Sequence, residues 1–434
     1  MWAIGNFFCT MRRMTSNPYA TGLSLMADNR FAEAEPCFAE QLANGPADDD
    51  GIRLYYLSLL YQGKHRTVIE HVCGQIDIEQ STRVLHDLMM RSILAGQRNF
   101  IDGLHTATSE DDPRTRAITC YWKGCLAHLD NHKLNIDTYF EDARAQAFKC
   151  DGLAMDDAAR ESILAAGNVS LQDFQKIVRE GTDTATDIRT IVKPGDDVAN
   201  EHDFVFFMSA DGGYTDTYAE EALGAIARAG ANSTTPYACH LHLIGADDAA
   251  IERVRDLASR TPGVILTVTS EPDPPTDAAF NRYTYYACNR FIQAAEIIKR
   301  HDRDLLIIDI DDFIKDNVGD MTTAARNYDV CFFQNPSPTP QVVCSAAAVY
   351  VTNNAQGRSF LDGMSRYIAK RLAEGGRWML DQAALYCALK VLGRPEGPIG
   401  FGDFSQILEA SLRDYLTESD KTDAKNNRNA GRFG

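Results

Sequence analysis

Four similar segments recur at a fixed spacing in the first half of the chain. Each begins 34 residues after the one before, at residues 23, 57, 91 and 125, and they read LSLMADNRF, LSLLYQGKH, RSILAGQRN and CLAHLDNHK. Apolar residues occupy the early positions, and a polar or glycine-containing turn follows at Asp28-Asn29, Gln62-Gly63, Gly96-Gln97 and Asp130-Asn131. A fixed period of this length predicts stacked helix–turn–helix units, because one such unit cannot bury its apolar face alone.

The second helix of a unit is clearest in the first copy. Phe31, Ala34, Phe38 and Leu42 share one helical face, and Gly45-Pro46 would end the helix. The stretch ADNRFAEAEPCFAEQL resembles the second helix of the tetratricopeptide repeat, which has the same period. The resemblance implies an α-solenoid whose groove binds a partner or presents a protein or glycan acceptor. A plain helical spacer is the alternative.

The pattern changes near residue 200. Residues 181–201 are rich in Thr and Asp and contain Pro194-Gly195, a composition typical of a linker, so we expect the two halves to be separable there. Beyond the linker, short apolar runs alternate with helical patterns, which predicts a mainly parallel sheet with helices on both faces. The predicted strands are 204–208, 238–244, 264–268, 305–308, 330–333 and 342–351, and the predicted helices lie near 216–230, 247–260, 278–300, 357–373 and 381–392.

Acidic residues follow two of the predicted strands. Asp211 comes after the first strand of this half, and Asp309, Asp311 and Asp312 come after the fourth, in the sequence LLIIDIDD. In an open α/β sheet, ligands bind beyond the carboxyl ends of the strands. Carboxylates there can share a hard cation such as Mg²⁺ or Mn²⁺ with substrate phosphates. The pattern therefore predicts a metal–diphosphate site.

Four motifs of the second half, in this order, resemble the GT-A glycosyltransferases, the nucleotide-diphospho-sugar transferase fold. They are FVFFMSADGGY, RYTYYACNRFIQAAEIIKRHDRDLLIIDID, VVCSAAAVYVTNNAQGRSFLDGM and RWMLDQAALYCAL. In that family they correspond to the base and ribose strand, the Arg-bearing helix with the Asp-x-Asp strand, the acceptor-side strand with its following helix, and the Asp-Gln helix near the acceptor. The resemblance covers roughly residues 200–400 and implies a GT-A-like, Rossmann-like domain acting as a hexosyltransferase-like enzyme on a sugar nucleotide.

The resemblance gives five residues a role toward the donor. Asp309 and Asp311 would bridge a divalent metal, Mn²⁺ or Mg²⁺, and the nucleotide-diphospho-sugar. Asp211 and Tyr214 would hold the ribose or stack on the base. Arg290 would lie near the diphosphate or the aspartates, because its planar fork matches paired oxygens.

The resemblance places two further residues near the transferred sugar. Asp381 and Gln382 would face the acceptor or the donor sugar as the catalytic pair. Each assignment has a structural alternative: Asp381 as a helix N-cap, Asp309 as a turn cap, and Arg290 as an ion-pair partner on a helix face. Trp378 is expected in the core.

One departure from the family pattern supports a second hypothesis. Many metal-dependent members use a late histidine ligand, and this chain has no histidine after His301. The alternative function is therefore a non-catalytic adaptor with a degenerate glycosyltransferase-like domain. A third hypothesis makes Asp309-Ile310-Asp311 the nucleophile loop of a haloacid-dehalogenase-like phosphotransferase. That loop normally follows the first strand of its domain, whereas at least three predicted strands precede it here, which disfavours the hypothesis.

Composition limits the classes of partner. The chain has 434 residues, with 43 Lys and Arg against 61 Asp and Glu and a net charge of −18. This balance argues against a general nucleic-acid binder, which needs a basic face. No apolar stretch is long enough for an integral membrane segment. The short apolar N-terminus precedes Arg12-Arg13, the wrong order for a signal peptide, and the 11 scattered cysteines contain no CxxC pair. We therefore expect a cytoplasmic protein.

The predicted organisation is an all-α domain followed by an α/β domain. It comprises tetratricopeptide-like repeats over 1–180, a linker over 181–201, a GT-A-like domain over 202–416 and a disordered tail over 417–434.

Overall fold

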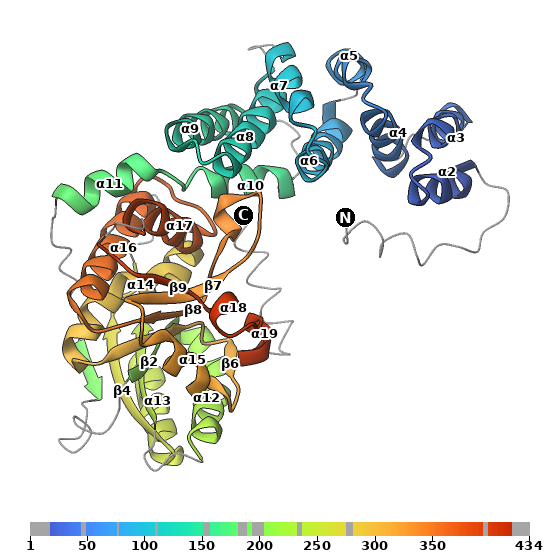
Figure 1. The fold of residues 1–434 in the computed structure, drawn as a ribbon. Coiled ribbons are helices and arrows are strands. Elements are labelled where there is room, and N and C mark those ends of the chain that lie inside the picture. Colours follow the sequence, from blue (N-terminus) through green and yellow to red (C-terminus); the bar gives the residue numbers. More distant parts are fainter. Residues whose placement is uncertain are drawn as a thin grey trace. The chain divides into compact units, whose positions relative to one another are not determined.

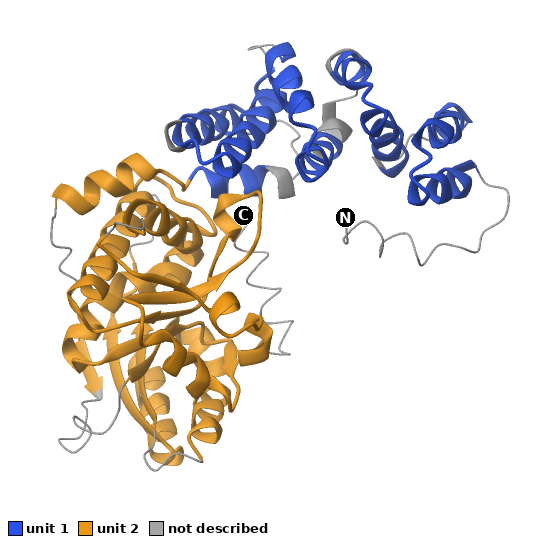
Figure 2. Ribbon diagram, viewed as in Figure 1, with its two compact units in different colours: residues 1–167 blue, residues 168–434 orange. Residues whose placement is uncertain are grey.

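The computed structural model describes residues 18–44, 49–75, 78–108, 112–150, 157–180, 189–192, 204–231, 237–274, 281–393 and 398–418. The chain forms two compact units, residues 1–167 and 168–434 (Figure 2). Gly45-Pro46, most of the predicted linker and the tail from residue 419 lie outside the described residues.

The first unit is built from helices in its described part (Figure 1). They are α2 (Pro18–Ala27), α3 (Phe31–Asn44), α4 (Asp49–Tyr61), α5 (His65–Gln75), α6 (Ile78–Leu94), α7 (Arg98–Ala107), α8 (Pro113–Leu129), α9 (Lys133–Lys149) and α10 (Asp157–Ala166). Consecutive helices pack as the pairs α2–α3, α4–α5, α6–α7 and α8–α9. Ala34 and Phe38, two of the residues predicted to face inward, are fully buried.

The four predicted turns share one backbone conformation. Each contains a residue with left-handed φ: Asn29 at 58°, Gly63 at 74°, Gly96 at 71° and Asn131 at 57°. In each turn the next N–H donates to the carbonyl five residues earlier, over 2.8 Å in Arg30–Leu25, Gln97–Ser92 and His132–Ala127 and 3.0 Å in Lys64–Leu59. This is the hydrogen bond that closes a helix when Gly or Asn follows it. The repeated turn residues therefore have a conformational cause.

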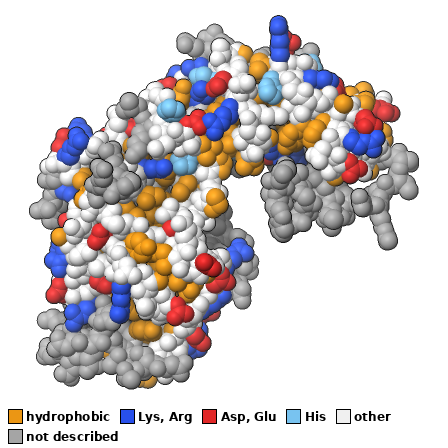
Figure 3. Space-filling view, viewed as in Figure 1, with side chains coloured by type: hydrophobic (Ala, Val, Ile, Leu, Met, Phe, Trp, Pro, Cys, Tyr) orange, Lys and Arg blue, Asp and Glu red, His pale blue; other side chains and the backbone are white. Residues whose placement is uncertain are grey.

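Figure 3 shows hydrophobic side chains gathered on the visible face of the helices of this unit, between scattered charged ones. Leu94, Leu129 and Phe148 are large apolar side chains that stay exposed, at 68%, 43% and 39%. The ends of these helices therefore leave some large apolar side chains exposed to solvent.

The second unit contains a large mixed sheet. Its strands are β1 (Arg189–Val192), β2 (Phe204–Asp211), β3 (Tyr237–Ile244), β4 (Val264–Glu271), β5 (Asp304–Ile308), β7 (Val330–Gln334), β8 (Cys344–Val351) and β9 (Phe401–Asp403), in the order β1-β4-β3-β2-β5-β8-β7-β9. The run β4-β3-β2-β5 is parallel, as is β7-β9, whereas β1-β4, β5-β8 and β8-β7 are antiparallel.

The prediction of a mainly parallel sheet is therefore corrected to a mixed one. The physical reason lies in the short connection from Gln334 to Cys344, which holds only the 3-10 helix η3 (Pro340–Val342). A parallel crossover needs a dozen or more residues, so two strands joined this closely pair antiparallel.

Helices cover both faces of the sheet. α12 (Gly212–Ala229), α13 (Asp248–Arg260) and α15 (Val318–Ala325) close an apolar core over one face. On the other face, α14 (Arg282–His301) packs on β2 and β5, α17 (Leu380–Leu392) packs on β8, and α16 (Ala355–Ala373) packs on α14 and α17. No described helix is both long and apolar enough to cross a membrane.

The second unit begins before the predicted linker. Helix α11 (Leu171–Glu180), which the sequence prediction assigns to the repeats, packs on α16 and α17. Phe174 of this helix is fully buried, and Asp173 bonds Lys370 at 2.9 Å and Arg371 at 3.0 Å. Strand β1 lies inside the predicted linker and joins the edge of the sheet. Both elements therefore belong to the α/β unit.

The described chain ends in the same unit. After α18 (Phe404–Ile407) and α19 (Leu412–Tyr415), strand β10 (Leu416–Glu418) pairs antiparallel with β6 (Asp312–Ile314). Thr417 and Glu418, which the sequence prediction assigns to the disordered tail, thus lie in a strand. This strand pairs with β6, which begins at Asp312, the last aspartate of the turn after β5.

This boundary gives a testable fragment pair. Residues 168–434 should be soluble and melt cooperatively, whereas residues 200–434 should lose at least about 3 kcal/mol of unfolding free energy, because buried Phe174 and Leu171 each contribute about 1.5–3 kcal/mol. Urea unfolding of both fragments measures the difference. Equal midpoints would show that α11 and β1 contribute nothing to the unit.

Candidate active site

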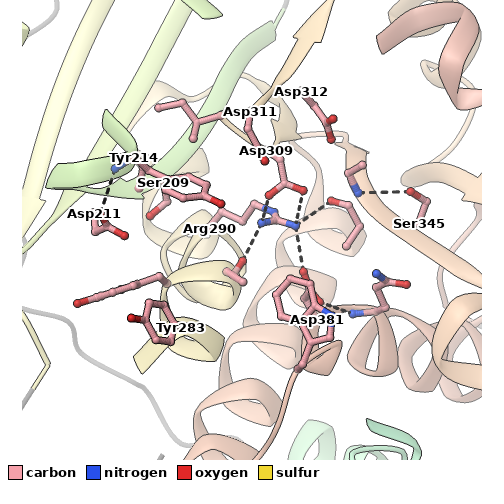
Figure 4. A pocket seen from close by; sticks show the side chains of 18 residues that line it. Ser209, Asp211, Tyr214, Tyr283, Arg290, Asp309, Asp311, Asp312, Ser345 and Asp381 are labelled. Atoms are coloured by element: carbon pink, nitrogen blue, oxygen red, sulfur yellow. Dashed lines mark hydrogen bonds and ion pairs between the residues drawn. The ribbon is translucent and has the colours of Figure 1, made fainter. Parts of the chain in front are cut away.

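A cavity of about 200 Å³ opens where β2 and β5 end, at the carboxyl edge of the parallel strands. Its lining includes all seven residues that the sequence selected: Asp211, Tyr214, Arg290, Asp309, Asp311, Asp381 and Gln382. They come from β2, α12, α14, α17 and the turn after β5, so residues far apart in the sequence meet in one place (Figure 4).

Arg290 is the centre of the site. Its guanidinium makes a two-pronged contact with the carboxylate of Asp309, including a 3.2 Å hydrogen bond from Nη2 to Oδ2, and Nη2 also reaches Oδ2 of Asp381 at 3.0 Å. Nη1 donates to the carbonyl oxygen of Ala287 at 2.7 Å, and Nη2 to that of Ala346 at 3.2 Å. Arg290 thus joins the Asp-x-Asp turn to the Asp-Gln helix (Figure 4).

Burial and charge act in opposite directions on Arg290. Its side chain is 4% exposed, and burial alone would lower its pKa. The charges of Asp309 and Asp381 outweigh this and raise the pKa above its ordinary value. Five aspartates line the cavity, namely Asp211, Asp309, Asp311, Asp312 and Asp381, and Arg290 is the one Lys or Arg in the described lining. The cavity is therefore acidic apart from this one guanidinium.

The aspartate turn holds its side chains by backbone contacts. Asp309 donates its N–H to the carbonyl of Ala347 at 3.4 Å, and Asp312 donates to the carbonyl of Asp309 at 3.2 Å. The side chain of Asp309 is 33% exposed, and the residue Asp311 is 8% exposed. Asp309 therefore faces both Arg290 and the cavity.

Asp211 and Asp381 differ in their local role. Asp211 is the N-cap of α12 and accepts from the N–H of Tyr214 at 3.1 Å, so it has a capping role that the sequence did not assign. Asp381 is not the N-cap of α17. That position belongs to Met379, whose φ of 64° is left-handed, and Asp381 lies in the first turn, accepting from the N–H of Gln382 at 2.9 Å.

Several residues that line the cavity were not predicted from the sequence, or were predicted to lie elsewhere. Trp378, expected in the core, is half-buried and lines the cavity, because the pattern of a buried aromatic does not distinguish a core from a pocket wall. Ser209, Tyr283, Tyr286 and Ser345 also line it. The two tyrosines belong to the motif RYTYYACNR, which has three aromatic residues within the first five positions of helix α14. This cluster of aromatic residues could have indicated a wall of the site.

The segment 354–357, part of the third sequence motif, stabilises the start of α16 and does not line the cavity. Asn354 caps α16 by accepting from the N–H of Gly357 at 2.8 Å. A Cβ at Gly357 would lie 2.0 Å from the carbonyl oxygen of Thr352, so no side chain fits.

A second cavity of about 410 Å³ shares Asp211, Tyr283 and Tyr286 with the first. It extends to the ends of β3 and β4, where Arg282 forms an ion pair with Asp273 and the Tyr286 hydroxyl donates to Asp273 at 2.7 Å. The two cavities give an elongated site along the strand ends.

A buried polar network lies between the sheet and α14. The carboxylate of Glu271 accepts from Tyr285 at 2.6 Å, from Asn289 at 2.6 Å and from Gln293 at 2.5 Å. Asn289 in turn accepts from the hydroxyl of the lining residue Ser209 at 2.8 Å. These contacts fix α14, which carries Arg290, against the strands.

Histidines continue this network away from the cavity. His240 bonds Thr267 at 2.8 Å and His301 at 2.9 Å. Burial lowers the pKa of His240 well below its ordinary value, and burial lowers the pKa of His301 to about 4. Both histidines are therefore neutral in the folded protein near pH 7.

This network predicts a loss of stability in mild acid. Between pH 6.5 and about 4 the unfolded chain binds protons that folded His301 does not, so stability falls as pH falls, by on the order of 3 kcal/mol across the window. Urea unfolding at pH 7.5 and 4 measures it. His301→Gln should flatten the slope, and His132→Gln, at an exposed position, should not. Equal slopes in all three proteins would contradict the prediction.

No protein-family model matches the chain, and no curated protein matches it in sequence. Several solved structures show a distant likeness, among them the following three. The galactosyltransferase LgtC, in complex with donor and acceptor sugar analogues, has a TM-score of 0.33 and 16% identity over 42% of this chain and 69% of that one. Mouse xyloside xylosyltransferase 1 has a TM-score of 0.31 and 11% identity over 46% of this chain and 85% of that one. The bifunctional glycosyltransferase WbbM has a TM-score of 0.30 and 13% identity over 69% of this chain and 50% of that one.

All three neighbours are glycosyltransferases, but a likeness of this size assigns no family. The function must therefore be inferred from the site.

Proposed function

We propose that the second unit is a glycosyltransferase that takes a sugar from a nucleotide-diphospho-sugar. The observation that carries the proposal is that Arg290 bonds both Asp309 and Asp381 in a cavity at the strand ends. The three residues come from two separate sequence motifs. A purely structural ion pair would give no reason for Asp211, Tyr214 and Gln382 to line the same cavity.

The net reaction would exchange one bond to the sugar for another. An acceptor hydroxyl oxygen bonds to the anomeric carbon, the bond from that carbon to the diphosphate oxygen breaks, and the hydroxyl proton leaves to solvent. Asp211 and Tyr214 would hold the nucleoside, Arg290 would face the diphosphate or the donor sugar, and Asp381 with Gln382 would orient the sugars.

A divalent metal fits the chemistry of the donor set only with help from the substrate. Among the described residues no group of three or more His, Cys, Asp or Glu side chains is placed to hold a metal. Mg²⁺ and Mn²⁺ can, however, bind to one or two carboxylates together with substrate phosphates and water. Asp309 and Asp311 would supply those carboxylates, and the ion would supply positive charge at the leaving diphosphate.

The helical unit would recruit the acceptor or a partner. Its turns recur near the 34-residue period, each with a left-handed residue and the same closing hydrogen bond. These features support tetratricopeptide-like repeats, which present a binding groove.

A donor screen tests the proposal. We expect at least one of UDP-glucose, UDP-galactose, ADP-glucose and GDP-mannose to raise the melting temperature of the full chain, and to do so more strongly with Mn²⁺, because a ligand that binds only the folded state stabilises it. EDTA should remove the additional shift.

The alternative is an adaptor without turnover. The absence of a three-ligand group among the described residues favours it, as does the engagement of Asp309 by Arg290. A melting temperature unchanged by every donor, with and without Mn²⁺, would leave the adaptor hypothesis ahead.

A further inference from the structure

The loop between α16 and α17 is built to hold Trp378 in place. The buried side chain of Asn168 donates to the carbonyl oxygens of Arg377 at 3.0 Å and Trp378 at 3.3 Å, and it accepts from the N–H of Arg377 at 3.3 Å. Met379 follows in a left-handed conformation, with a φ of 64°, that is strained for a residue other than glycine. A loop with this anchoring and this strain presents one fixed side chain to the cavity.

The chain segment that carries Trp378 reaches the side of Arg290 away from Asp211, where Asp381 lies three residues further on. Figure 4 shows Asp211, Tyr214 and Tyr283 on one side of Arg290, and Asp381 and Ser345 on the other. The second cavity continues the site on the Asp211 side. Trp378 lines the first cavity together with Asp381 and Gln382, which follow it on the same chain segment. A nucleotide lying along the strand ends would leave this side to the sugars.

The side chains that line the cavity together with Trp378 suit a saccharide. One face of a pyranose carries C–H groups, which pack well on the electron-rich face of an indole. Its hydroxyls need partners that can donate and accept, and Gln382, Ser345 and Asp381 supply both kinds. An acidic wall of this kind offers no complement to a negatively charged acceptor.

We propose that Trp378 is the platform on which a neutral saccharide acceptor binds, with Asn168 as the residue that positions it. The proposal rests on the proposed glycosyltransferase function and names the acceptor class. It selects a glycan acceptor over a protein side chain.

Tryptophan fluorescence gives a direct readout of saccharide binding. The chain has three tryptophans; Trp122 is fully buried, and Trp2→Phe removes the one at the N-terminus. In this background, a panel of methyl α- and β-D-glucopyranosides, galactopyranosides and mannopyranosides with lactose should include at least one sugar that changes the emission. Trp378→Ala should abolish that change. No response to any sugar of the panel would overturn the proposal.

Two further variants separate a platform from a structural role. With the donor found in the screen, Trp378→Ala should raise the KM for the saccharide at least about tenfold and leave donor affinity within about twofold, whereas Trp378→Phe should restore most of the loss. Asn168→Ala should act in the same direction on the saccharide KM. Tyr283→Ala, on the opposite side of Arg290, should weaken the donor and spare the saccharide.

The outcomes distinguish the two proposals. If donors bind and Trp378→Ala leaves saccharide binding intact, the platform is wrong and the glycosyltransferase proposal stands. If no donor binds but saccharides change the Trp378 emission, the platform stands as a carbohydrate site without transfer. If Trp378→Ala weakens donor and saccharide equally, Trp378 serves the general structure of the site, and the acceptor assignment is overturned.

Discussion

Asp309→Asn and Asp311→Asn should each reduce the affinity for a sugar nucleotide in the presence of Mn²⁺ by at least about 100-fold. Asparagine keeps the shape of aspartate but removes the negative charge that a hard cation needs. Without the cation, the diphosphate would meet a cavity lined by five aspartates and one arginine. Calorimetric titration with the donor and Mn²⁺, beside urea unfolding of each variant, measures the loss.

The two variants should differ in stability. Asp309 holds Arg290 through two contacts, so Asp309→Asn weakens a buried ion pair, whereas the charge of Asp311 influences Arg290 at longer range. Asp256→Asn is a matched control, because it removes one charge from an exposed position on α13. A role in capping gives the opposite result: asparagine caps nearly as well as aspartate, so both variants would bind the donor as wild type does.

The sequence predicted that Asp211 and the aspartates after β5 lie at the same edge of the sheet, and both line one cavity. Apolar runs that end in Asp211 and in Asp309 mark buried strands, and the ends of parallel strands meet at one edge of a sheet. Arg290 and Asp381 are selected by the resemblance of RYTYYACNR and RWMLDQ to motifs of the GT-A glycosyltransferases. The sequence could not show that each is the partner of the other, since 91 positions separate them.

The errors follow from pairing and packing between distant segments. The residues of β8 do not indicate that it runs antiparallel to β5, because the direction of a strand depends on the connection that precedes it. Helix α11 has the amphipathic pattern of the repeats, so its packing on α16 and α17 could not be read from the pattern. Trp378 looks like a core residue until the strained turn at Met379 is known.

Arg290→Met should cost about 3–5 kcal/mol of unfolding free energy at pH 7, the usual result of leaving buried charges without a partner. Methionine fills a similar volume but leaves Asp381, whose side chain is 10% exposed, and Asp309 facing each other across an apolar side chain. The carbonyl of Ala287 also loses its donor. Urea unfolding at pH 7 measures the cost.

Removing the carboxylate charges should reverse most of that loss. In the triple variant Arg290→Met, Asp309→Asn, Asp381→Asn the charges of all three bonded side chains are removed, and replacing a whole buried ion cluster by neutral groups is often close to neutral in stability. With the double variant Asp309→Asn, Asp381→Asn completing the cycle, the departure from additivity gives the coupling between the guanidinium and the two carboxylates. A single variant as stable as wild type would mean that water already solvates both aspartates. Arg290 would then be free to meet a ligand without first releasing its partners, and the affinity of the wild-type site for an anionic donor would not depend on breaking the pair with Asp309.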